Sequence, residues 1–314
     1  EICACLVGSE MCIRDRRMTI MTTTFIPCGA KTPIIALIAG AFFPENSWVA
    51  PGAYFIGVGA IILSGLILKK TAMFAGDPTP FVMELPIYHI PAWKNVIIHA
   101  WDRCKAFVQK AGTVIFVSSA LIWFLSSYNW KVDSVEQNDS MLASIGNVAA
   151  PVFQPLGWGE WKPTMATITG LIAKENVVGT FGVLYHFGGE ELSENGDEIW
   201  SLVAADYTAL SAYAFMIFNL LCAPCFAAMG AIKREMNNGK WTAFAIGYMC
   251  ALAYCSALVV YQLGGLITGE VGFNLFTIVA AVVLVGFIYL MVRPNKYVGD
   301  NEVKIDVKKI TASK

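Results

Sequence analysis

Long apolar runs are the feature that most restricts how this chain can fold. Six runs are long and apolar enough to cross a bilayer as helices, which takes about twenty residues. They cover residues 26–44, 48–68, 111–128, 208–232, 240–263 and 272–292. The mean hydropathy is +0.58 and only 14% of the residues are charged, against about 25% in an average soluble domain. We therefore expect an all-α polytopic membrane protein with about six transmembrane helices.

Charge and cysteine content exclude other classes of protein. The formal net charge of -1 provides no basic surface for nucleic acid. The nine cysteines are an odd number and lie mostly inside apolar runs, which argues against a disulfide framework. Residues 1–17 combine three cysteines with dense charge and no apolar period. We interpret them as a non-native leader, with an ordinary cytoplasmic loop as the alternative, and we expect the chain to be a fragment.

The distribution of Lys and Arg predicts the orientation in the membrane, because cytoplasmic loops carry an excess of both. Residues 69–110 and the tail 293–314 contain such an excess and are predicted to be cytoplasmic. The first of these combines a proline-rich strap with an amphipathic helix that begins at Trp93. The segment 186–207 is acidic and has no Lys or Arg, so it is predicted to face outward, together with the loop 129–162.

This orientation leaves the apolar run 163–187 with both ends outside. We therefore predict a re-entrant hairpin or a broken helix, with Gly170 and Gly179 permitting the turn. Lys174 and Glu175 lie between the two glycines. Charged residues inside a membrane are costly and mark ion pathways. The alternative is a buried ion pair that only fixes the hairpin to another helix.

The string from Leu220 to Gly230 is the strongest candidate for metal chemistry. Pro224 lacks an N–H, so it should free the carbonyl of Leu220 and bend the helix. Cys222, Cys225 and Met229 recur at three and four residues and should share one face at the bend. Sulfur ligands suit a borderline transition metal better than Mg²⁺ or Ca²⁺. Packing residues and a Cys-x-x-Cys redox pair remain alternatives.

A second interruption, Phe25 to Pro33, contains two prolines and a glycine around Cys28. Lys31 follows close to the cytoplasmic end of the run. We expect its side chain to extend to the membrane surface and assign it no ligand role.

Several of these strings, in this order, resemble the bacterial ferrous-iron transport protein B (FeoB) family. They are Arg17-Met-Thr-Ile with Pro-Cys-Gly-Ala-Lys, Thr79-Pro-Phe-Val-Met-Glu-Leu-Pro86 with Tyr88, Lys110-Ala-Gly-Thr-Val-Ile, Ala173-Lys-Glu-Asn-Val-Val-Gly-Thr180 and Pro224-Cys-Phe-Ala-Ala-Met-Gly-Ala-Ile232. The resemblance covers most of residues 18–292. It implies nucleoside-transporter-like gates, with Cys225 as the second-gate thiol and Cys28 as the intervening thiol on the Fe²⁺ route.

The resemblance also implies a domain order. It comprises a membrane segment 18–68 with the Pro-Cys-Gly motif, the cytoplasmic part 69–110, a second gate 111–232, a transmembrane pair 233–292 and the tail. Members of the family begin with a GTP-binding domain and a first gate. No G-x-x-x-x-G-K-[ST] phosphate loop occurs in this sequence, so GTP and Mg²⁺ would act only through that missing domain, and we expect no enzyme activity from this fragment.

The expected function is Fe²⁺ uptake across the bacterial inner membrane. The expected partners are Fe²⁺, the lipid bilayer, the missing GTPase domain, small cytoplasmic accessory proteins and a second copy of the chain. Two alternatives stay open: a transporter of another divalent metal or small solute, and a membrane thiol–disulfide oxidoreductase.

Overall fold

The computed structural model describes residues 16–46, 48–71, 73–74, 93–131, 133–135, 137–172, 174, 176–185 and 199–294. Within these residues the regular structure is helical, and the only β-type pairing is an isolated bridge between Tyr128 and Ser134. The all-α class is confirmed. The first fifteen residues, most of the proline-rich strap, the acidic segment 186–198 and most of the C-terminal tail lie outside the described residues.

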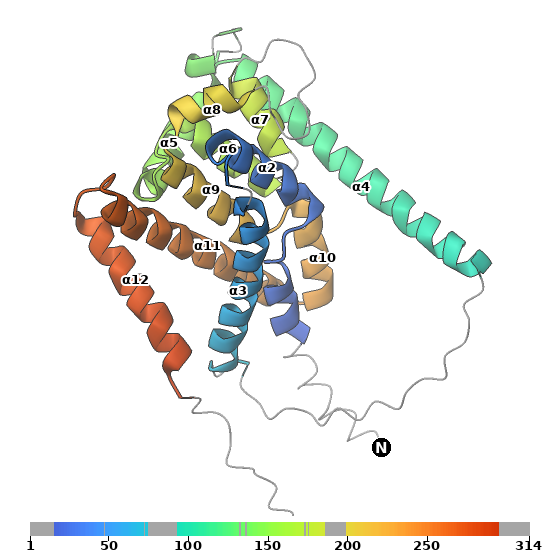
Figure 1. Ribbon diagram of the computed structural model, residues 1–314. Helices are drawn as coiled ribbons and strands as arrows, with labels where there is room; N and C mark the ends of the chain where they lie inside the picture. The colour runs from blue at the N-terminus through green and yellow to red at the C-terminus, as the bar shows by residue number, and fades with distance from the viewer. Residues whose placement is uncertain are drawn as a thin grey trace, which may run out of the picture.

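Three of the described helices are long and apolar enough to cross a membrane: α3 (Val49–Lys69), α11 (Gly239–Thr268) and α12 (Leu275–Val292). Each corresponds to a predicted crossing. Helix α11 packs against both α12 and the shorter α9 (Ala209–Leu221), as Figure 1 shows. The first predicted crossing is shorter than expected. It consists of the 3-10 turn η1 (Gly29–Lys31) and helix α2 (Thr32–Phe42).

Helix α4 (Trp93–Ser127) is continuous over 35 residues. It joins the predicted amphipathic helix and the predicted crossing 111–128, so residue 110 is not a boundary between two elements. The stretch has no proline and only one glycine, Gly112, and therefore nothing in it breaks a helix. In Figure 1, α4 is straight and extends well away from the bundle.

The segment 129–162, predicted as an outer loop, contains an apolar helix. Ser140 caps the N-terminus of α5 (Met141–Phe153) by accepting a hydrogen bond from the N–H of Ala143 at 3.1 Å. The 3-10 turn η3 (Gln154–Leu156) follows α5, and α5 packs against α6 (Trp161–Ile172). A Cβ at Gly146 would lie 3.0 Å from the Cβ of Trp161, so glycine is what lets the two helices approach. The run was too short to be recognised as a crossing.

The predicted broken helix over 163–187 is present. Helix α6 ends at Ile172, and α7 (Asn176–Leu184) begins after a turn that contains Lys174. The two helices pack against each other. Gly170 and Gly179 lie inside α6 and α7 rather than at the turn, contrary to the prediction. A Cβ at Gly170 would lie 2.8 Å from Val177 Cγ2, so this glycine serves the close contact between the helices.

Other packing contacts join distant parts of the chain. The short helix α8 (Trp200–Asp206) packs on α2, where the ring of Trp200 fills the space beside Gly40. The buried amide of Gln262 on α11 donates to the carbonyl of Pro155 in η3 at 2.6 Å and accepts from the hydroxyl of Thr277 on α12 at 3.3 Å. A fully paired polar side chain of this kind fixes the relative position of the elements it joins.

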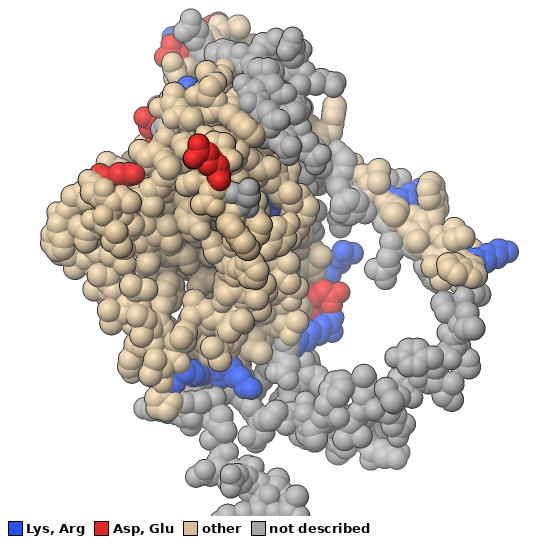
Figure 2. Space-filling view, viewed as in Figure 1, with Lys and Arg blue, Asp and Glu red and all other residues tan. Residues whose placement is uncertain are grey.

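Charged side chains are sparse over the face of the helical body in Figure 2, and Lys and Arg gather at its lower end. Helix α3 ends there at Lys69 and Lys70, α12 is followed by Arg293, and the ammonium of Lys70 donates to the carbonyl of Met291. Figure 2 also shows Asp and Glu mainly over the upper half of this face, with some Lys or Arg among them. The orientation in the membrane stays a prediction.

Candidate metal-transport site

The predicted crossing 208–232 is broken in its middle. Helix α9 ends at Leu221 and α10 (Phe226–Met236) begins after the extended residues Cys222 to Cys225. Cys222 has φ -65° and ψ 168°, and Cys225 has φ -59° and ψ 161°. A proline disfavours the helical conformation in the preceding residue and cannot donate within the helix. Pro224 therefore breaks the helix here, where the sequence predicted only a bend.

The break changes how the sulfur atoms are arranged. Cys222, Cys225 and Met229 were predicted to share one helix face, but Cys222 follows the end of α9, and Cys225 precedes α10. Only Cys225 and Met229 are joined by a helical turn, through the hydrogen bond from the N–H of Met229 to the carbonyl of Cys225 at 2.9 Å. Backbone carbonyls at such a break have no partner within the helix.

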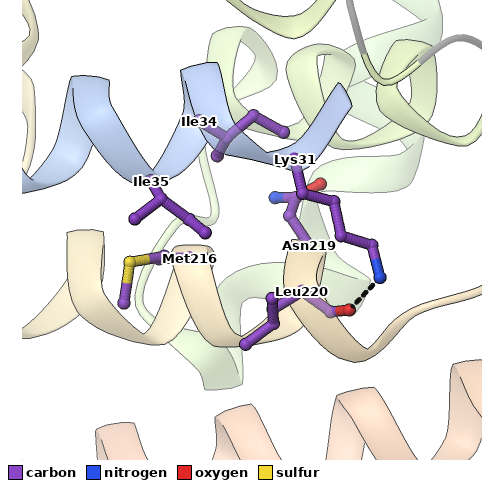
Figure 3. Close-up of a pocket in the computed structure, with 6 residues that line it drawn as sticks. All are labelled: Lys31, Ile34, Ile35, Met216, Asn219 and Leu220. Atoms are coloured by element: carbon purple, nitrogen blue, oxygen red, sulfur yellow. Dashed lines mark hydrogen bonds between the residues drawn. The ribbon is translucent and has the colours of Figure 1, made fainter. Parts of the chain in front are cut away.

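Two lysines supply partners for those carbonyls. The ammonium of Lys174 donates to the carbonyl of Asn219 at 2.6 Å and lies 3.0 Å from Cys222 Sγ. The ammonium of Lys31 donates to the carbonyl of Leu220 at 2.6 Å (Figure 3) and to the carbonyl of Thr24 at 3.0 Å. Lys31 and Lys174 are the only charged side chains buried in the described part of the chain, 2% and 1% exposed.

The burial of Lys31 contradicts the prediction that its side chain extends to the membrane surface. The carbonyl of Leu220 is free of its helical partner, as predicted, but a lysine occupies it. The reason is a packing contact between distant parts of the chain. Helix α2 packs against α9, so the residue just before α2 lies at the C-terminal end of α9, where the helix dipole favours a cation.

The cysteines that the sequence singled out gather around these lysines. Cys28 immediately precedes η1 and is exposed, Cys222 is buried, and Cys225 is half-buried at the start of α10. All three thiols lie within electrostatic range of the ammonium of Lys31. Each of these three cysteines lies next to the end of a helix.

Cys250 on α11 was predicted to be a packing residue only. The structure brings it to the break as well, because its thiol lies close to the backbone N–H of Ala223. The sequence contained no indication of this, since Cys250 lies in the middle of an uninterrupted apolar helix. Glu175 lies outside the described residues.

Thiol sulfur and carbonyl oxygen together form a mixed donor set that suits a borderline divalent ion such as Fe²⁺. No group of three or more His, Cys, Asp or Glu side chains among the described residues could hold a metal ion.

Comparisons with known proteins point to the same region. Residues 50–103 match the family described as "Ferrous iron transport protein B C terminus", and residues 108–239 match the family described as "Nucleoside recognition", or Gate. The second match includes the α6–α7 hairpin and the break between α9 and α10. No solved structure matches the chain.

Curated relatives carry the name "Fe(2+) transporter FeoB". The protein of Shigella flexneri is 38% identical over 79% of this chain and 38% of its own length. That of Staphylococcus aureus (strain COL) is 37% identical over 81% of this chain and 37% of its own length. That of Salmonella paratyphi A is 34% identical over 95% of this chain and 45% of its own length.

This chain thus spans less than half of the length of these relatives. The two family matches follow one another along the sequence, and the relatives align with most of it. The chain belongs to the ferrous iron transport protein B family and carries its C-terminal and gate domains.

Proposed function

We propose that this chain is part of a permease that takes up Fe²⁺ across the bacterial cytoplasmic membrane, and that the ion passes the break between α9 and α10. The observation that carries the proposal is the gathering of Cys28, Cys222 and Cys225 around the end of α9, where the two lysines bind carbonyls that have no partner within the helix. Broken helices in transporters place such carbonyl ends at ion sites. The names of the relatives supply the identity of the ion.

Within this proposal Cys225 and Cys28 are ligands on the route, Met229 and Cys222 are further sulfur ligands, and Pro224 maintains the break. In the complete protein we expect GTP and Mg²⁺ to bind a separate domain, so that this chain carries the ion path and not the hydrolysis. Contacts with small accessory proteins and with a second copy of the chain belong to the same proposal.

The experiment is uptake of radiolabelled Fe²⁺ under anaerobic conditions by proteoliposomes that contain the complete protein. Fe²⁺ should accumulate, and excess Mg²⁺ should not compete because it prefers all-oxygen sites. Equal uptake of Mg²⁺, or no uptake of Fe²⁺, would contradict the proposal. Trapping of a disulfide between Cys222 and Cys225 during turnover would favour the oxidoreductase instead.

Glu175 is assigned to the ion path by its sequence position alone. A carboxylate is the oxygen ligand that a divalent cation would use beside sulfur. We expect Glu175→Gln, nearly the same shape without the charge, to lower Fe²⁺ uptake by about tenfold or more while the protein remains folded, as for loss of a charged ligand worth at least 1.4 kcal/mol. Normal uptake by this variant would mean that the charge is structural.

A further inference from the structure

The end of α9 has the features of a cation site, and a side chain fills it. Helix α9 stops at Leu221, so its last carbonyls point out of the helix with the negative end of the helix dipole behind them. The carbonyl of Leu220 is 2.6 Å from the ammonium of Lys31. An ammonium held at this distance from a carbonyl occupies the position that a bound cation would take.

A second oxygen atom at the same place has no hydrogen-bond partner among the described residues. The side chain of Asn219 is 1% exposed, and its Nδ2 donates to the carbonyl of Phe215 at 3.0 Å. This bond fixes the orientation of the amide, and Asn219 Oδ1 is buried without a hydrogen-bond partner among the described residues. A buried oxygen left in this way is destabilising, and a bound cation would remove that cost.

Gly170 of α6 leaves space beside Asn219 Oδ1. A Cβ at Gly170 would lie 3.3 Å from Asn219 Oδ1, so a larger residue would close the space beside it. The side chain of Asn219 lies next to that of Lys31 in Figure 3, and both line a crevice between α2 and α9.

The crevice cannot hold the ammonium of Lys31 and a metal ion at the same time. It is lined by Lys31, Ile34, Ile35, Met216, Asn219 and Leu220 and has no room for a water molecule. A metal ion can therefore reach the carbonyl of Leu220 only after the ammonium has moved away. Simultaneous occupation would also place the metal ion beside the ammonium of Lys31, which already lies within electrostatic range of Lys174.

We propose that Lys31 is a tethered cation that an incoming divalent metal displaces from the carbonyl of Leu220 and from the vicinity of Asn219 Oδ1. Its second bond, to the carbonyl of Thr24 at 3.0 Å, gives the ammonium a partner to retain when it leaves. Lys174 keeps its bond to Asn219 and stays in place. The inference rests on the proposed function, because it names the residue that keeps the path closed when no ion is present.

The first test uses the unaltered complete protein in detergent without oxygen. Amines are acylated with acetic anhydride with and without Fe²⁺, and modification is measured by mass spectrometry at Lys31. The exposed Lys240 at the start of α11 is the internal reference. We expect Lys31 to be protected without metal and to be modified at least about fivefold faster with Fe²⁺, the lower end of a typical coupling between two sites. Equal modification in both conditions would overturn the proposal.

The second test compares Lys31→Met with Lys240→Met. Removing the competing ammonium should tighten Fe²⁺ binding by about tenfold, a coupling of about 1.4 kcal/mol, and should make the protein more dependent on Fe²⁺ for thermal stability. Lys240→Met should behave like the unaltered protein. Unchanged or weaker binding by folded Lys31→Met would contradict the displacement, and the acylation result decides the question if this variant does not fold.

The two proposals fail in different ways. Fe²⁺ uptake without any effect on Lys31 would leave the permease proposal intact and remove this one. Exposure of Lys31 by Mn²⁺ or Zn²⁺, in a protein that does not take up Fe²⁺, would keep the displacement and change the substrate.

Discussion

Lys174→Met should lower the amount of folded protein in the membrane several-fold. Methionine keeps the length of the side chain but cannot donate. The carbonyl of Asn219 would lose the ammonium at 2.6 Å and keep only the weak thiol donor of Cys222 at 3.6 Å, and the α6–α7 turn would lose its link to α9. A hydrogen bond from a charged group contributes about 1.5–3 kcal/mol, and a loss of 1–2 kcal/mol changes the folded population by about 5–30-fold. The measurement is the monodisperse fraction after solubilisation, together with the midpoint of thermal unfolding.

Lys105→Met on α4 is the control, because Lys105 is exposed. Transport per folded molecule should fall less than abundance, since Lys174 holds the hairpin rather than the ion. Normal abundance and heat stability of Lys174→Met would show that the link is dispensable and that this assignment is wrong.

Cys225→Ser should reduce Fe²⁺ uptake by about tenfold or more without changing the amount of protein, because replacing a soft sulfur ligand by a hydroxyl removes the preferred ligand for the ion. Cys225 is half-buried at the first turn of α10, and its side chain makes no capping hydrogen bond there. Its loss should therefore affect the path and not the fold. The measurement is initial uptake rate divided by transporter abundance.

Cys104→Ser and Cys255→Ser are the matched controls, on α4 and on α11. Cys250 is unsuitable as a control because its thiol lies close to Ala223 at the break. If all three variants lost uptake equally, the thiols would act through folding, and the metal path would have to lie elsewhere.

The sequence was sufficient to predict features that depend on local chemistry. Long apolar runs predicted α3, α11 and α12, because a bilayer requires each crossing to satisfy its own backbone hydrogen bonds. The distribution of Lys and Arg, which left both ends of the run 163–187 outside, predicted the break between α6 and α7. Pro224 predicted the position of the second break, between α9 and α10. The length of this break depends on the residues before the proline as well.

Features that depend on distant partners were not predictable. Lys31 was predicted to reach the membrane surface because it lies close to the cytoplasmic end of its run, whereas its acceptor on α9 is 189 positions away. Helix α5 was missed because a helix shorter than a crossing is stable in a membrane only where other helices surround it. Cys250 could be connected with the break only once α11 and the extended segment were seen together.

The uninterrupted course of α4 has a mechanical consequence. At about 1.5 Å per residue its 35 residues measure roughly 50 Å, well beyond the hydrocarbon thickness of about 30 Å. With no hinge along this length, the helix moves as a stiff rod. The carbonyl of Tyr128, directly after the last turn, accepts from the N–H of Met141 at the start of α5 at 3.0 Å. We therefore expect a tilt imposed on the end at Trp93 to reach the start of α5.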